Sequence, residues 1–199
     1  MRRLVLLAAG AMASALALAS CGNGGHAPTR LGLGPHPASG ARADCSRRSV
    51  GHFQDEFHSP RSIVVGPLAF VGAADAARAS VAEVARFGGW KSPVLLRPGH
   101  AATVQVAPSA RGRAGLLGYG HEAAGRSVRD ADRSVAFVAC DRRRSDSHAG
   151  GRRVTFWSGA FVASSLPACV PLDVLVDRER APRRIVVSLA AGRCATVGT

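Results

Sequence analysis

The sequence predicts an all-β domain of about seven to nine strands with one short helix, tied together by disulfide bonds. From Ser134 to Cys194 the chain consists of short runs rich in Val, Ile, Phe, Trp and Thr, separated by Gly, Pro and charged residues. This is the composition of strands joined by turns. Cys140 and Cys169 lie in the same stretch as Cys194, and Cys45 lies far before it. The length of 199 residues suits one domain and a tail.

The first twenty residues have the features of a secretory signal. Two arginines at positions 2 and 3 precede an apolar run, residues 4–18, that is too short and too rich in Ala for a membrane span. The sequence Leu-Ala-Ser-Cys at 18–21 resembles the lipobox of bacterial lipoproteins. That resemblance implies that residues 1–20 are removed, that Cys21 is lipidated, and that the lipid holds the chain on the outer side of the cell membrane. The alternative is an ordinary secretory signal with Cys21 just after its cleavage site.

Residues 21–44 are predicted to be the lipidated cysteine and a disordered tether. They are mostly Gly, Ala, Pro, His and Arg, and contain few large apolar side chains that could offset the entropy cost of ordering. A flexible coil of that length spans roughly 25 Å on average. Residues 45–199 are then expected to form a single domain.

The first half of that domain contains three predicted elements. Residues 62–72 predict a strand broken at Gly66-Pro67, which places it at an edge or a kink because proline cannot donate to a ladder. Residues 73–87 predict a short helix ending at Gly88-Gly89. Residues 93–97 and 102–106 flank Pro-Gly-His and predict a β-hairpin, since apolar and polar residues alternate in the second run.

The last pattern, an apolar strand, Arg-Pro-Gly-His, an alternating strand and Pro, resembles strands of immunoglobulin-like domains, and it implies an immunoglobulin-like β-sandwich. The Cys–Trp–Cys signature of true immunoglobulin domains is absent. The segments Gly-Pro-Leu, Arg-Pro-Gly-His, Cys-Val-Pro-Leu-Asp-Val and Gly-Arg-Cys resemble uncharacterised lipoproteins of high-GC bacteria. That resemblance implies a shared fold and carries over no catalytic residue.

With Cys21 lipidated, four cysteines remain, and they allow three pairings. Residues 172–176 and 184–189 predict an antiparallel hairpin with Cys169 and Cys194 beyond its open end. This favours a Cys169–Cys194 bond, which leaves Cys45 with Cys140. The expected register puts Cys169 opposite about residue 190.

No sequence motif for a nucleophile, a phosphate loop or a zinc protease is present. His52, Asp55, Glu56 and His58 are metal-ligand types at a spacing that fits no usual zinc site, so we expect a polar loop with its two phenylalanines turned inward. We predict no metal and no cofactor. His121 beside Glu122 could serve acid–base chemistry, although neighbours in a strand face opposite ways. An envelope-polymer-modifying hydrolase using this pair is therefore the alternative function.

A formal charge of +13, which becomes +11 once the signal arginines are removed, attracts polyanions. If strands 134–140 and 154–162 formed a hairpin, five arginines would gather at its end and could bind phosphates or carboxylates in bidentate fashion. These candidate anion-binding residues are Arg142, Arg143, Arg144, Arg152 and Arg153. A solvated loop is the other interpretation.

The function expected from these observations is non-catalytic. The chain is predicted to be an envelope lipoprotein, attached to the membrane by its N-terminal lipid, that binds an anionic lipid, a cell-wall polymer or a partner protein. Nucleic acid is not expected as a partner, because the interleaved aromatic residues of a stacking surface are missing.

Overall fold

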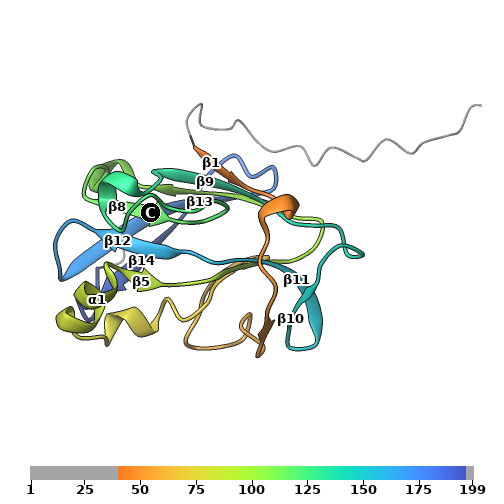
Figure 1. The fold of residues 1–199 in the computed structure, drawn as a ribbon, viewed down its shortest axis with the longest axis horizontal. Helices are drawn as coiled ribbons and strands as arrows, with labels where there is room; N and C mark the ends of the chain where they lie inside the picture. Colours follow the sequence, from red (N-terminus) through yellow and green to blue (C-terminus); the bar gives the residue numbers. More distant parts are fainter. Residues whose placement is uncertain (1–39, 196–199) are drawn as a thin grey trace, which may run out of the picture. The chain divides into compact units, whose positions relative to one another are not determined.

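The computed structural model describes residues 40–195, which fold into a mostly β domain with fourteen strands and one α-helix (Figure 1). The strands form sheets of five, six and three strands. The predicted signal, the lipidation site Cys21 and most of the predicted tether lie outside the described residues.

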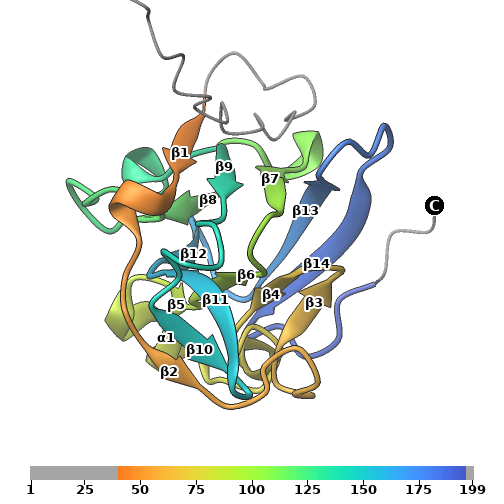
Figure 2. The same ribbon diagram turned by 90° about the vertical axis from the view of Figure 1, so that its right-hand side faces the viewer.

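The five-stranded sheet has the order β1-β9-β7-β13-β14 and lies across the top of the domain in Figure 2. Only β1 and β9 are parallel. The predicted C-terminal hairpin is confirmed as β13 and β14, with Cys169 opposite Ser188 instead of residue 190. Strand β1 lies within the segment predicted as tether, so ordered chain begins before residue 45. The strands are β1 (Ala41–Ala43), β9 (Ser134–Val138), β7 (Ala101–Val106), β13 (Ala168–Val176) and β14 (Arg183–Leu189).

The six-stranded sheet has the order β2-β10-β11-β6-β4-β3, with β2 parallel to β10 and the other pairs antiparallel. Gly66 has a φ of +57°, which suits the tight turn that joins β3 to β4. Residues 62–72 are therefore a hairpin whose first strand is the sheet edge. The strands are β2 (His52–Phe53), β10 (Ser147–Ala149), β11 (Arg152–Trp157), β6 (Val94–Leu96), β4 (Leu68–Phe70) and β3 (Ile63–Val65). The three-stranded sheet consists of β5 (Trp90–Lys91), β12 (Ala160–Ala163) and β8 (Ala114–Leu117).

Two of the predicted hairpins are wrong. Strands β6 and β7 flank the Arg97-Pro-Gly-His100 turn but belong to different sheets, and so do β9 and β11. A short turn can return a chain to the strand it has left or carry it across the core to a second layer, and turn composition alone does not distinguish these outcomes. The three sheets do not show the expected immunoglobulin-like arrangement of seven to nine strands, and many strands have only two or three residues.

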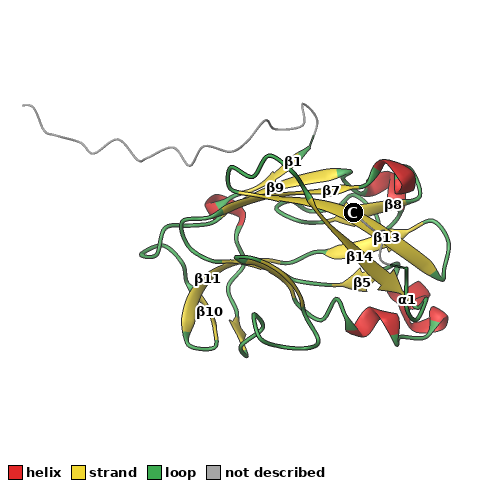
Figure 3. Cartoon of the chain, turned by 180° about the vertical axis from the view of Figure 1, so that it is seen from behind, coloured by secondary structure: helices red, strands yellow, loops and turns green. Residues whose placement is uncertain are grey.

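The predicted helix is present as α1 (Val81–Phe87) (Figure 3). The Ser80 hydroxyl accepts a hydrogen bond from the backbone N–H of Glu83 at 3.1 Å, which caps the first turn. Gly88 adopts a left-handed conformation with φ of +68°, and its N–H donates to the last helical turn. The helix is shorter than predicted because a 3₁₀ turn, Asp75–Ala77, precedes it.

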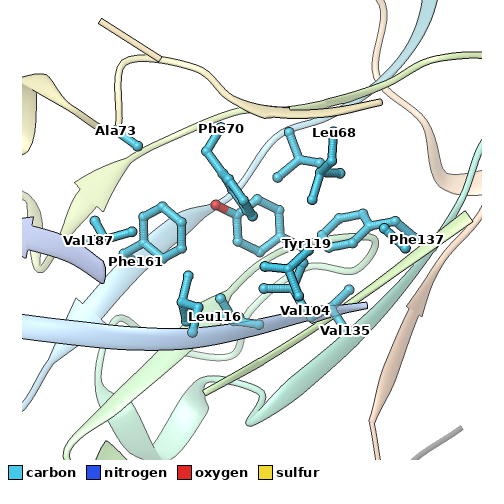
Figure 4. Packing of buried hydrophobic residues seen from close by; sticks show 14 of the residues in the cluster. Leu68, Phe70, Ala73, Val104, Leu116, Tyr119, Val135, Phe137, Phe161 and Val187 are labelled. Carbon is cyan, nitrogen blue, oxygen red and sulfur yellow. The ribbon is translucent and has the colours of Figure 1, made fainter. Parts of the chain in front are cut away.

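One main core joins the sheets (Figure 4). Tyr119 lies between Phe137, with ring centroids 5.6 Å apart, and Phe161, with centroids 6.3 Å apart. Its hydroxyl donates to the backbone oxygen of Ser92 at 2.7 Å. Complete burial raises the pKa of the Tyr119 phenol far above its ordinary value, so the group stays neutral and acts as a donor.

A second, smaller cluster lies on the opposite face of the six-stranded sheet. Along β4, Leu68 and Phe70 belong to the main core whereas Ala69 belongs to the second cluster, as the alternation of side chains in a strand requires. The partly buried Phe53 and Phe57 pack against this second cluster, in agreement with the predicted inward-turned phenylalanines. Phe57, Ala149 and Val154 of this cluster also line a surface cavity.

Two disulfide bonds fasten the ends of the domain. Cys45 is bonded to Cys140 with a Cα–Cα distance of 4.9 Å, and Cys169 to Cys194 with a distance of 5.8 Å. These are the two pairs that the sequence favours. The first bond joins the segment after β1 to the residues that follow β9, and the second closes the open end of the β13–β14 hairpin.

Candidate functional site: a basic pocket

A cavity of about 580 Å³ lies beside the β10–β11 hairpin. Phe57, Ala149 and Val154 line it, and all three belong to the second apolar cluster or pack against it. Arg97 and His100, from the turn that leaves β6, complete another part of the wall. The volume is typical of small-molecule sites, which occupy roughly 300–1,000 Å³.

The walls of this basic pocket carry many more positive than negative groups. Four arginines line it, and Asp55 is the only acidic residue among its lining residues. The two aspartates of the neighbouring loop are engaged elsewhere: Asp141 accepts the backbone N–H groups of residues 143 and 144, and Asp146 pairs with Arg48. The pocket therefore attracts anions. The four arginines are Arg97, Arg142, Arg152 and Arg153.

Two of these arginines are held in place by contacts within the domain. The guanidinium carbon of Arg97 lies 4.5 Å from the centroid of the Phe57 ring, which is a cation–π geometry. Arg153 donates from Nη1 to the backbone oxygen of Ser145 at 3.0 Å. Both contacts restrict the side chain and leave other N–H groups of each guanidinium for an oxyanion, so less ordering is needed when an anion binds.

The structure brings together three of the five arginines predicted from the sequence. Arg142 and the two residues at the start of β11, Arg152 and Arg153, line the pocket. Arg143 and Arg144 are exposed and do not line it. Arg97 was missing from the predicted set because the turn that contains it is separated from the Arg-rich loop by more than forty residues of sequence.

Two histidines of the pocket wall are each oriented by an aspartate. Nδ1 of His58 lies 2.8 Å from Oδ2 of Asp55, and Nδ1 of His100 lies 2.8 Å from Oδ2 of Asp177. Since a carboxylate accepts, Nδ1 carries the proton in each ring. Within residues 40–195, Nε2 of both rings has no hydrogen-bond partner, so this atom is available to a bound ligand.

Two further histidines stack on one another outside the pocket. His52 and His148 occupy paired positions of β2 and β10, and their rings stack with centroids 5.7 Å apart and an interplanar angle of 11°. Residues 40–195 contain no group of three or more His, Cys, Asp or Glu side chains that could hold a metal ion.

His121 is poorly placed to act as a base with Glu122. Its Nδ1 lies 3.0 Å from the backbone oxygen of Glu122, and its Nε2 lies 2.6 Å from Oδ2 of Asp132. Both partners are acceptors, so both ring nitrogens donate, which favours the charged imidazolium. The Glu122 carbonyl and then the Asp132 carboxylate raise the pKa of His121 above its ordinary value. Neither His121 nor Glu122 lines the basic pocket.

The raised pKa of His121 predicts a pH-dependent contribution to stability. A group whose pKa is higher in the folded state stabilises the fold fully below its unfolded pKa and loses that effect as pH rises through its folded pKa. We therefore expect His121→Asn to lower the free energy of unfolding more at about pH 5 than at about pH 9, by roughly 0.2–1 kcal/mol for a pair that is still partly exposed to solvent. Urea unfolding at both pH values measures the difference. The difference should shrink when Asp132→Asn is already present, and an equal loss at both pH values would contradict the assignment.

No protein-family model, curated protein or solved structure matches this chain. Between residues 40 and 195 there is no helix whose length and apolar character would allow it to cross a membrane.

Proposed function

We propose that this protein is a membrane-anchored lipoprotein of the cell envelope whose domain binds an anionic envelope component in the basic pocket. The observation that carries the proposal is the convergence of four arginines on one pocket that contains a single carboxylate. The lipobox-like sequence at Cys21 supports the anchor. The two disulfide bonds support a location outside the cytoplasm, where such bonds persist.

The chemistry of the pocket favours phosphate groups of a cell-wall polymer as the ligand. Guanidinium groups form paired hydrogen bonds with phosphate and carboxylate oxygens, and these bonds are stronger than neutral ones. Several arginines around one cavity suit a ligand with closely spaced anionic groups. With the proton on Nδ1, the Nε2 atoms of His58 and His100 are acceptors, so they suit hydroxyl groups of such a polymer and not its phosphate oxygens.

The proposal is tested with two variants of equal charge. One changes the pocket arginines Arg97, Arg142, Arg152 and Arg153 to Gln, and the other changes the exposed Arg143, Arg144, Arg178 and Arg180, none of which lines the pocket. The comparison is made at about 0.15 M salt, where diffuse electrostatic attraction is screened beyond about 8 Å. Bidentate contacts persist at that salt concentration, and only the second variant retains the pocket arginines that make them. We therefore expect the first variant to bind polyphosphate at least about tenfold more weakly than the second. Calorimetry or fluorescence anisotropy measures the affinities.

Equal loss of affinity in the two variants would mean that the basic surface acts only through net charge, and the pocket would be withdrawn as a site. Stronger binding to phosphatidylglycerol vesicles than to polyphosphate, again lost in the pocket variant, would identify a lipid headgroup as the ligand. Release of inorganic phosphate from polyphosphate that disappears in His100→Asn would favour a hydrolase at this pocket. The hydrolase expected at His121 and Glu122 gains no support from the geometry of that pair.

A further inference from the structure

A second cavity, a groove of about 1000 Å³, lies between α1 and the segment that precedes β9. Its lining comes from α1, from residues 126–133 and from residues 163–166 at the end of β12 and just after it. Figures 1 and 3 place α1 and the β10–β11 hairpin toward opposite ends of the domain. No residue lines both this groove and the basic pocket, so the groove is a separate site.

One side of the groove is apolar and built largely from small residues. Val84 is buried, and Val81, one turn before it in α1, is 44% exposed. Val128, Leu166 and several alanines and glycines also line the groove. Together these residues form an apolar surface that is exposed to solvent and that an apolar ligand can cover.

Three arginines give the groove positive charge, and Asp130, beside Arg129, accepts hydrogen bonds from Ser127 and is not among the lining residues. Arg126, Arg129 and Arg133 line it and are exposed, and no Asp or Glu is among its lining residues. In the described part of the chain, none of these three guanidinium groups takes part in an ion pair. Three free guanidinium groups beside an apolar wall are complementary to a molecule with an anionic head and an apolar tail.

We propose that this groove binds a single-chain anionic amphiphile, with its head at the three arginines and its acyl chain against α1. The volume lies at the upper end of the range for small-molecule sites, roughly 300–1,000 Å³. A protein partner fits less well, because the centres of protein interfaces are rich in aromatic side chains and the groove is lined by none.

Monomeric dodecyl phosphate, below its micelle concentration, is the probe. We expect it to bind the full chain at about 0.15 M salt. Dodecyltrimethylammonium has the same tail but a cationic head, and inorganic phosphate has a related head but no tail. Each therefore lacks one of the two contacts and should bind at least about tenfold more weakly than dodecyl phosphate. Changing Arg126, Arg129 and Arg133 to Gln should weaken dodecyl phosphate binding about tenfold or more. The matched control changes Arg143, Arg178 and Arg180, which lie outside the groove, and should retain the affinity.

A second variant tests the tail. Val81→Asn places a neutral polar group at the first residue of α1 and beside the proposed acyl chain, without changing the charge of the groove. It should weaken dodecyl phosphate binding while leaving polyphosphate binding at the basic pocket unchanged. Binding that is equal in the groove and control variants, or equal for dodecyl phosphate and inorganic phosphate, overturns the proposal. So does a groove variant that loses binding to phosphatidylglycerol vesicles but keeps binding to the monomeric amphiphile.

Discussion

Loss of the Cys45–Cys140 bond is expected to lower the free energy of unfolding by roughly 4–5 kcal/mol. The two cysteines are 95 residues apart, so the bond restricts a large loop in the unfolded chain. The chain-entropy relation gives roughly 4.7 kcal/mol for a loop of that length. Because this approaches the whole stability of a typical domain, roughly 5–15 kcal/mol, the Cys45→Ala, Cys140→Ala double variant should unfold at much lower urea concentration.

The second bond provides a matched comparison. Cys169 and Cys194 are 25 residues apart, for which the same relation gives roughly 3.5 kcal/mol. Replacing these two cysteines with Ala should therefore destabilise the domain less than replacing the first pair. Urea unfolding of both double variants and of the oxidised parent measures the order. The reverse order would contradict the loop-entropy account of these bonds.

Replacing Cys21 with Ser is expected to move the protein from the membrane fraction to the soluble fraction or to leave its signal uncleaved. In bacterial lipoproteins, whose lipobox residues 18–21 resemble, the cysteine thiol carries the diacylglyceryl group. A serine hydroxyl cannot take its place. Each buried methylene of an acyl chain contributes about 0.8 kcal/mol to membrane binding, so loss of two chains removes far more than any single contact in the domain.

Fractionation after spheroplast lysis, together with labelling by an alkyne fatty acid, measures both outcomes. The control is Ser20→Ala, which keeps a small residue before Cys21 and should leave anchoring and labelling unchanged. Unaltered labelling and membrane association of the Cys21→Ser protein would exclude the proposed anchor.

The features that the sequence predicts correctly depend on residues close to one another in the chain. The β13–β14 hairpin and α1 fall in this group, since alternation and the Ser80 and Gly88 caps are local signals. Which strand lies next to which in a sheet depends on the whole core. The Pro98-Gly99 turn therefore carries no local sign that it leads from the six-stranded to the five-stranded sheet.

The same distinction applies to the basic pocket. Arg142, Arg152 and Arg153 could be predicted as neighbours because a short loop and a hairpin join them. Arg97 reaches them only because β6 pairs with β11. The contact of His100 with Asp177 spans 77 residues, and neither residue has a sequence neighbour that points to the other.

The position of the Cys45–Cys140 bond determines how mechanical load would travel through the protein. A pull on the N-terminus can peel β1 from β9, but it meets a covalent cross-link at Cys45 and passes directly to Cys140. Arg142, in the wall of the basic pocket, is the second residue beyond that point. Tension between a membrane anchor and a ligand held at Arg142 would thus follow a short covalent route that bypasses residues 46–139, which include four of the six strands of the larger sheet.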